Sequence, residues 1–393
     1  MSKRHHVMLV VGESSGDVLG AALMTSLKGV LKDRVRFSGV GGPRMTAEGL
    51  TSIFPMTDIA VMGPREVIPR LPLILRRMRE TTKHAVENKP DLLVIIDSPD
   101  FTHTVAKRIH KKVPTIPIAN YVSPSVWAWR RGRAKAMAKY LKKVFALLPF
   151  EPAFFRAEAG LDCEYVGHPA IEKIATPQEG VEFRRAKLID ADAPVLLMLP
   201  GSRTNEVKRL IGLMGETATL LSKSQPNIRI VIPVVPHVAE LVKEAVSDWP
   251  VAPVLAVGDE EKRGAFSAAT TALAASGTVS LELGLARIPM VVAYKIDKIA
   301  AWVVGGLLKV PTVVLVNLIL DRPSVSEFLQ SAATPQALAD ALTPLLSDTE
   351  CRRNALRDLD EMRELMGVGG PSPSARAANA ALEMLGETPV SRQ

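Results

Sequence analysis

The chain has 393 residues, 47% of them hydrophobic and 23% charged, which is typical of a folded globular protein too long for one ordinary core. Its net charge of +8 favours anionic partners, whereas an aromatic content of 5% argues against binding of single-stranded nucleic acid by base stacking. The two cysteines, Cys163 and Cys351, lie far apart in sequence. They exclude a disulfide framework and a zinc knuckle and suit a reducing compartment.

No stretch of the sequence is long and apolar enough to span a membrane. The N-terminal run VMLVV is too short for the apolar part of a signal peptide and predicts a first β-strand. The most apolar stretch elsewhere, IAAWVVGGLL at 299–308, falls short of the roughly 20 residues that cross a bilayer. We therefore expect a cytoplasmic protein, which could still lie on a membrane surface.

Short apolar runs alternate with longer helical patterns along the whole chain. Because their apolarity is continuous, they predict strands buried on both faces of parallel sheets that helices cover. The repeat predicts an α/β protein of two Rossmann-like, doubly wound domains. The runs are VMLVVG (7–12), RFSGVGG (36–42), DLLVIIDS (91–98), TIPIANYVS (115–123) and VFALLPF (144–150), then VLLMLPGS (195–202), IRIVIPVV (228–235), VLAVGD (254–259), TALAAS (271–276) and PMVVAY (289–294).

A polar segment around 172–194 separates the two sets of strands. We predict an N-terminal domain over 1–172, a C-terminal domain over 173–360 and a helical tail over 361–393 that packs on an N-terminal domain. Ligands of such sheets bind at the carboxyl ends of strands, where helix N-termini point outward. Two facing domains would therefore hold a substrate in the cleft between them.

The stretch 61–80, VMGPREVIPRLPLILRRMRE, mixes apolar residues with five arginines and three prolines. The prolines predict that it is not one long helix. An apolar surface bordered by arginines suits contact with anionic lipid. Packing against a core with a solvated basic face is the alternative, and the composition favours it.

The loop GESSGD at 12–17 follows the first predicted strand and opens a helix. Its glycines allow a tight turn, and the amides of the helix start can hold an anion. Ser15 or Asp17 could instead simply cap the helix. Since the loop is not GxGxxG, it gives little support for a dinucleotide site.

Two similar loops follow strands of the C-terminal domain. LPGSR places Gly201 and Ser202 in a turn and lets Arg203 reach a phosphate with two parallel hydrogen bonds. AASGTVSLE places Ser276, Gly277 and Thr278 at a helix start, with Glu282 about one turn later to accept bonds from sugar hydroxyls. Either loop alone could be an ordinary capped helix, but two in one domain favour a nucleotide diphosphate.

Carboxylates and histidines give a second set of candidates. In IDSPDF, Asp97 and Asp100 follow a buried strand, where one can act as a general base towards a hydroxyl or can hold the turn. His168 could line the cleft or be structural, and His5 and His6 belong to an expected disordered terminus. The pair in DAD at 190–192 is expected to be surface rather than a metal site.

The stretch 121–133, YVSPSVWAWRRGR, holds two of the four tryptophans and three arginines. A core strand does not normally run into such a cluster of positive charge. A nucleic-acid site, a membrane contact and a site for a phosphorylated substrate each explain it.

Taken together, these stretches resemble the lipid-A-disaccharide synthase family. The resemblance runs from about residue 7 to 330 and rests on GESSGDVLGA, GVGGPRM, AVMG, IDSPDF, YVSPSVWAWRRGR, LPFEPAFF, YVGHP, LPGSRTNEV, ASGTVSLE and PMVVAYKI, of which SPSVWAW is highly specific. It implies a GT-B fold whose first domain binds acceptor and whose second binds the UDP-sugar. It also implies transfer, with inversion, of 2,3-diacylglucosamine from UDP to 2,3-diacylglucosamine 1-phosphate by a peripheral protein on the cytoplasmic face of the inner membrane, often a dimer.

The resemblance, combined with the loop chemistry, assigns the site residues. Asp97 matches the proposed base that deprotonates the acceptor 6-hydroxyl. No metal or other cofactor is expected, because amides, a helix dipole and Arg203 would neutralise the leaving UDP. The expected donor-binding residues are Gly201, Ser202, Arg203, Ser276, Gly277, Thr278, Glu282 and Asn317, and the expected acceptor- and lipid-binding residues are Glu13, Ser14, Ser15, Trp127, Trp129, Arg130 and Arg131.

The sequence departs from the family near Asn317, where prolines are usual at the positions of Val316 and Ser326. This puts the local shape there in doubt. Three rival functions remain: a UDP-N-acetylglucosamine 2-epimerase, which shares the fold but has little use for the Trp/Arg stretch, a lipid-carrier glycosyltransferase, and a non-catalytic lipid-binding scaffold. A nucleic acid is not an expected partner, whereas an anionic membrane surface and a second copy of the chain are.

Overall fold

The computed structural model describes residues 3–60, 64–129, 131–295 and 310–389. The chain divides into an N-terminal unit, Met1–Glu172 with Gly369–Gln393, and a C-terminal unit, Lys173–Val368. Arg130 and the apolar stretch 299–308, both singled out in the sequence, lie outside the described residues.

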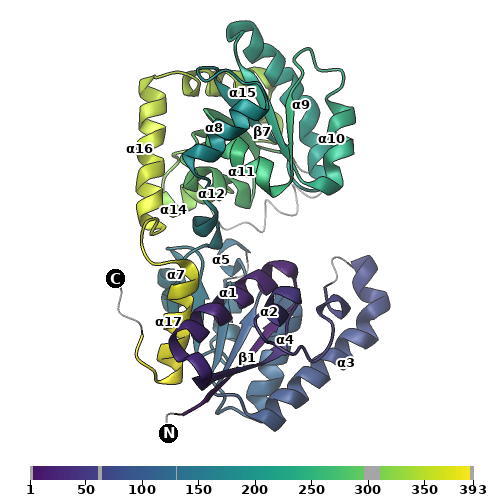
Figure 1. Ribbon diagram of the computed structural model, residues 1–393, viewed down its shortest axis with the longest axis vertical. Coiled ribbons are helices and arrows are strands. Elements are labelled where there is room, and N and C mark those ends of the chain that lie inside the picture. The colour runs from purple at the N-terminus through teal and green to yellow at the C-terminus, as the bar shows by residue number, and fades with distance from the viewer. Residues whose placement is uncertain (1–2, 61–63, 130, 296–309, 390–393) are drawn as a thin grey trace. The chain divides into compact units, whose positions relative to one another are not determined.

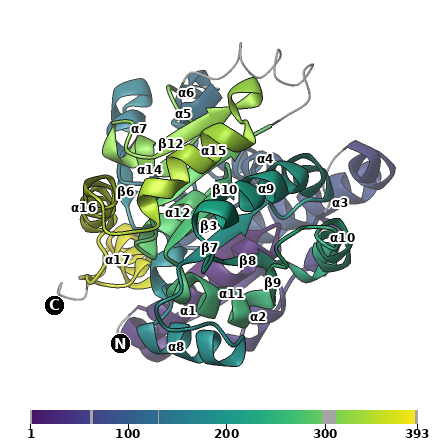
Figure 2. The same ribbon diagram turned by 90° about the horizontal axis from the view of Figure 1, so that it is seen from above.

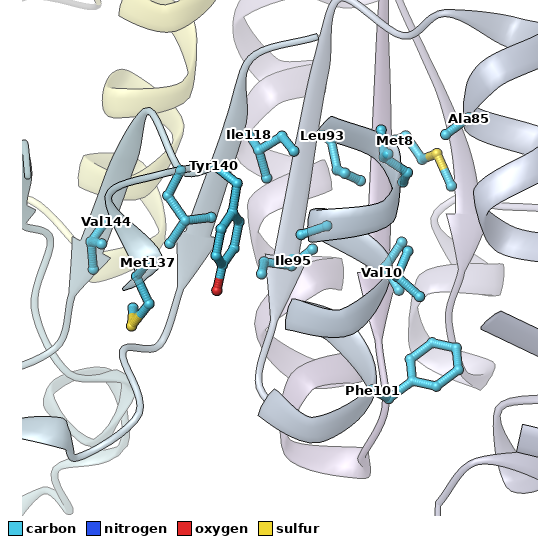
Figure 3. Close-up of a cluster of buried hydrophobic side chains, with 14 of the residues drawn as sticks. Met8, Val10, Ala85, Leu93, Ile95, Phe101, Ile118, Met137, Tyr140 and Val144 are labelled. Carbon is cyan, nitrogen blue, oxygen red and sulfur yellow. The ribbon is translucent and has the colours of Figure 1, made fainter. Parts of the chain in front are cut away.

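The N-terminal unit is built on a parallel sheet in the order β2-β1-β3-β4-β5-β6. Strand β1 is buried at every residue, with Leu9 in one core and Met8 in the core on the opposite face, shown in Figure 3. This is why its sequence is apolar without alternation. The strands are β1 (His5–Val11), β2 (Val35–Val40), β3 (Leu92–Ile96), β4 (Ile118–Tyr121), β5 (Lys143–Ala146) and β6 (Cys163–Tyr165).

Helices cover both faces of this sheet. On one face α1 and α17 lie side by side (Figure 1), and Ala377, Ala381 and Leu382 of α17 are fully buried with β1. The last helix of the chain therefore completes the N-terminal core. The helices of the unit are α1 (Ser14–Leu31), α2 (Pro43–Ala47), α3 (Pro64–Asn88), α4 (Pro99–Lys112), α5 (Val126–Trp129), α6 (Gly132–Met137), α7 (Glu151–Ala159) and α17 (Pro373–Leu385).

The C-terminal unit has a second parallel sheet, in the order β12-β11-β10-β7-β8-β9. Helix α9 packs with α15, and α8 packs with α11 (Figure 2). The strands are β7 (Val195–Leu199), β8 (Arg229–Val234), β9 (Val254–Val257), β10 (Thr271–Ala275), β11 (Met290–Tyr294) and β12 (Ser326–Leu329). The helices are α8 (Pro177–Ala186), α9 (Thr204–Ser224), α10 (Ala239–Ala245), α11 (Gly258–Ala268), α12 (Thr278–Leu285), α14 (Leu315–Leu320), α15 (Pro335–Leu342) and α16 (Glu350–Leu365).

The prediction that the prolines of 61–80 prevent one long helix was wrong. Helix α3 continues from Pro64 to Asn88 with Pro69 and Pro72 inside it. The helix is exposed at Ile68–Pro72, so water can bond the carbonyls that the prolines leave without a partner. Within the described part of the chain, no helix combines the length and the apolar character needed to cross a membrane.

The prediction of a disordered terminus at His5 and His6 was also wrong. Both belong to β1 and are buried, to 2% and 3% exposure. The His6 Nε2 lies 2.8 Å from the Ser38 hydroxyl, and the His5 Nε2 lies 2.7 Å from a Glu387 carboxylate oxygen. These partners are distant in sequence, so local composition did not reveal them.

Candidate functional site

Each unit has a pocket at the carboxyl end of its sheet, where open α/β sheets bind ligands, and the pocket of the C-terminal unit lies where the strand order reverses, between β7 and β10. The pocket of the N-terminal unit, about 340 Å³, is lined by the loops after β3 and β4. The pocket of the C-terminal unit, about 330 Å³, is lined by the loops after β7, β8 and β10 and by the start of α11. We call them the N-terminal pocket and the C-terminal pocket.

Backbone amides and a helix start dominate one wall of the C-terminal pocket. Gly277 has a φ of +148°, a conformation that side chains rarely adopt, and α12 begins directly after it at Thr278. No side chain caps that helix start. The pocket lining includes Ser276, Gly277 and Thr278, so the positive end of the helix dipole borders the pocket.

Arg203 stands on the opposite loop of the same pocket. Gly201 turns the chain at a φ of +113°, and Arg203 follows as the residue before α9, with its side chain 74% exposed. The Glu206 carboxylate accepts bonds from the Ser202 and Arg203 amides at 3.2 and 3.3 Å and from the Arg203 guanidinium at 3.0 Å. Glu206 thus accepts the hydrogen bonds that this turn and its arginine offer.

Glu282 also lines the C-terminal pocket, but its carboxylate pairs with the Lys262 ammonium at 2.5 Å. Lys262 lines the same pocket, and sequence reasoning did not select it. It lies on α11, which begins at Gly258 with a φ of +86°. A glycine directly after a predicted strand was the available clue, and the lysine supplies a second cation beside the amides.

Asn317 lies outside the lining of this pocket among the described residues. It is buried in α14, where its amide donates to the Val325 carbonyl at 2.9 Å and accepts from the Val325 amide at 2.7 Å. Its side chain therefore holds the loop after α14, which differs from the donor contact that the resemblance implied.

Asp97 lines the N-terminal pocket on a strained turn. Asp97 and Ser98 are consecutive non-glycine residues in the left-handed region, with φ values of +55° and +43°. Such strain is held by the surrounding structure and is frequent at active sites. One Asp97 oxygen accepts from the Ser98 amide at 2.8 Å and the other from the Ser15 hydroxyl at 2.7 Å. Asp100 is exposed on α4 and outside the pocket lining, so the structure separates the two carboxylates.

The GESSGD loop lies against Asp97. Burial, followed by the negative charge of Asp97, raises the pKa of Glu13. Ser14 is exposed at the first position of α1. Asp17, the other capping candidate, instead accepts from the amides of Gly42, Arg44 and Met45 at 2.8 to 3.0 Å. It therefore fixes the start of α2.

The two tryptophans of the Trp/Arg stretch, residues 121–133, have different surroundings. The Trp127 indole donates to Glu151 at 3.3 Å and packs edge-on against Phe150, so it is part of the domain. Trp129 is 43% exposed and lines the N-terminal pocket. Only the second ring is therefore offered to a ligand in this pocket.

The arginines of that stretch also differ in their surroundings. Arg131 is exposed, lies 3.4 Å from Glu158 and stands over the Phe154 ring, and it does not line the pocket. Arg133, which the sequence analysis did not assign, does line it. Among the residues that the structure describes, no group of three or more His, Cys, Asp or Glu side chains is placed to hold a metal ion.

Comparison with known sequences identifies the family. The model of the lipid-A-disaccharide synthetase family matches residues 7–381. The lipid-A-disaccharide synthase of Rhodospirillum centenum is 46% identical over 379 residues, covering 96% of this chain and 94% of the relative. That of Nitrobacter winogradskyi is 45% identical over 382 residues, covering 97% of this chain and 96% of the relative.

Solved structures agree on the fold. The UDP-GlcNAc 2-epimerase of Neisseria meningitidis bound to UDP-GlcNAc superposes with a TM-score of 0.62 at 14% identity, over 96% of this chain and 100% of that one. The calicheamicin glycosyltransferase gives 0.58 at 16% identity, over 98% and 99%. At this identity the likeness shows the fold alone, and it confirms the predicted GT-B architecture of two Rossmann-like domains. The chain belongs to the lipid-A-disaccharide synthase family of glycosyltransferases.

Proposed function

We propose that the protein transfers 2,3-diacylglucosamine from UDP-2,3-diacylglucosamine to 2,3-diacylglucosamine 1-phosphate and releases UDP. The observation that carries this proposal is family membership over nearly the whole chain. The contrast between the two pockets supports it, since one offers amides and cations to a diphosphate and the other offers a carboxylate to a hydroxyl.

The reaction is a single displacement. Asp97 accepts the proton of the acceptor 6-hydroxyl while that oxygen bonds to the anomeric carbon of the donor sugar. The bond from that carbon to the UDP oxygen breaks with its electron pair, so the configuration inverts. The Ser15 hydroxyl and the Ser98 amide hold the Asp97 carboxylate in place before the substrate arrives. Glu13 borders the same carboxylate and adds negative charge beside it.

The leaving diphosphate is stabilised in the C-terminal pocket. The amides at the start of α12 and the guanidinium of Arg203 meet charge that grows as the bond breaks, which lowers the barrier most where donors are already in place. Binding of the diphosphate requires Glu206 to release Arg203 and the two turn amides, or to share them. UDP-sugar affinity therefore includes the work of displacing that carboxylate.

The location proposed for the protein is the cytoplasmic face of the inner membrane, at its surface. Helix α3 supports this because Ile68 and Leu71 are 70% and 47% exposed, with Arg70 and Arg79 also exposed on the same helix. Apolar side chains bordered by cations suit an anionic bilayer that delivers acylated substrates. A homodimer is part of the same proposal.

The test uses purified protein in mild detergent with both proposed substrates. Mass spectrometry is expected to detect the acylated disaccharide phosphate, with matching UDP release that depends on acceptor. Epimerised UDP-sugar without acceptor would support the epimerase instead. Saturable lipid binding without any turnover would support the scaffold. Either result would overturn the proposed reaction.

A further inference from the structure

The N-terminal pocket carries two opposite charges. Among the described residues that line it, Asp97 and Arg133 are formally charged, and the rest are neutral or apolar. Arg133 is half-buried at the second position of α6, directly before the buried Ala134. Over the described part of the chain, no carboxylate forms an ion pair with Arg133. Its charge is therefore available to a ligand in the pocket.

A histidine in the same wall does not compete for that ligand charge. His103 is 2% exposed, and its Nδ1 lies 2.8 Å from the Tyr140 hydroxyl, whose ring belongs to the core shown in Figure 3. Burial, followed by the charges of Arg133 and Lys107, lowers the pKa of His103 to about 3. The imidazole is uncharged at neutral pH, so Arg133 is the cation of this wall.

We propose, on the basis of the proposed function, that Arg133 binds the phosphate of the acceptor and so fixes its direction in the N-terminal pocket. A phosphate monoester carries about −1.5 to −2 charges at pH 7 and suits the two parallel donors of a guanidinium. The Asp97 carboxylate repels such a group. The acceptor therefore lies with its phosphate at Arg133 and its hydroxyl end at Asp97, while Trp129 offers an apolar ring.

The test compares two acceptors, 2,3-diacylglucosamine 1-phosphate and the same sugar without phosphate, at saturating donor in an uncharged detergent. The wild type is expected to prefer the phosphorylated acceptor. Arg133→Ala is expected to raise KM for the phosphorylated acceptor by about 10- to 100-fold, to leave KM for the other unchanged, and so to abolish the preference. Lys135→Ala is the matched control, because it removes one exposed cation from the same helix and should keep the preference.

An Arg133→Ala enzyme that keeps the wild-type preference overturns the proposal. Unchanged UDP affinity and unfolding temperature show that the variant is folded, and Arg133→Gln, which retains more of the side chain, serves the same comparison if the alanine variant does not fold. Failure of the proposed function looks different, since the wild type would then make disaccharide from neither acceptor.

Discussion

Both pockets lie at the carboxyl end of a parallel sheet, yet their loops offer different groups to a ligand. In the N-terminal unit, the turn after β3 contains two strained non-glycine residues, Asp97 and Ser98, and presents the Asp97 carboxylate. In the C-terminal unit, the turns after β7 and β10 contain Gly201 and Gly277, which bring amides and a helix start to the surface. The fold determines where the ligand binds, and the loop residues determine which charge it meets.

Removal of the proposed base should have the largest effect on activity. Asp97→Asn is expected to lower kcat by roughly 10²- to 10⁴-fold, because the acceptor hydroxyl loses its proton acceptor. Calorimetry should show unchanged UDP-sugar affinity, since the proposed donor-binding residues belong to the C-terminal unit. Asp100→Asn, an exposed change on α4, should keep most of the activity. Equal activity in both variants would contradict the assignment of Asp97.

The corresponding change in the C-terminal pocket is Arg203→Ala. Loss of a charge-assisted contact to the diphosphate is expected to weaken UDP binding by about 10- to 100-fold. Titration calorimetry with UDP measures this directly. Lys208→Ala is the control, because Lys208 is exposed on α9, the helix that Arg203 directly precedes, and lies outside the pocket lining. Wild-type UDP affinity in Arg203→Ala would exclude Arg203 from the donor site.

Asp17→Asn separates structural carboxylates of the N-terminal unit from catalytic ones. The buried Asp17 carboxylate accepts from three amides, and the amide group of asparagine would point a donor at some of them. We expect a loss of about 1–3 kcal/mol in the free energy of unfolding. Urea denaturation measures this loss, and the affinity of the folded variant for the UDP-sugar should be unchanged. A variant as stable as the wild type would contradict this role.

An effect that depends on pH concerns Glu151, which is buried and accepts a hydrogen bond from the Trp127 indole. Its carboxylate accepts from the amides of Leu147 and Leu148 at 3.0 and 2.9 Å, and burial raises its pKa from 4.5 to about 7. Between these values the folded state keeps a proton that the unfolded state has lost. The stability that this group contributes is therefore complete below about pH 4.5 and is lost as the pH rises through about 7.

Glu151→Gln should flatten that dependence. The difference in unfolding free energy between wild type and variant is expected to change between about pH 4.5 and about pH 7, by at most about 1.4 kcal/mol per pH unit for one proton. Thermal unfolding at a series of pH values measures it. Parallel curves for the two proteins would show that the side chain does not titrate in this range.

Sequence reasoning found the elements that are buried and missed those that depend on distant contacts. The apolar runs predicted the central strands, because strands buried on both faces are apolar throughout. Strand β12 (SEFL) was missed because it is a short edge strand whose end residues, Ser326 and Leu329, are exposed. The proline rule failed at α3, since solvent can satisfy the carbonyls that prolines free at an exposed helix end.

The same limit applies to the site. Glycine turns and an aspartate after a strand are local patterns, so Gly201, Gly277 and Asp97 could be selected from the sequence. Which arginine of a cluster faces a pocket depends on partners such as Glu158, which binds Arg131 from another helix. Arg133 could therefore be found only once the chain was folded, whereas the glycine after a predicted strand was a clue to Lys262.

The central claim is a single displacement in which Asp97 activates the acceptor while the C-terminal pocket holds the leaving UDP. Its most direct test is the anomeric configuration of the new glycosidic bond, measured by proton NMR on the product of the wild-type enzyme. The account predicts a configuration inverted relative to the UDP-sugar donor. Retention of the donor configuration would contradict a one-step displacement and the role of Asp97 as its base.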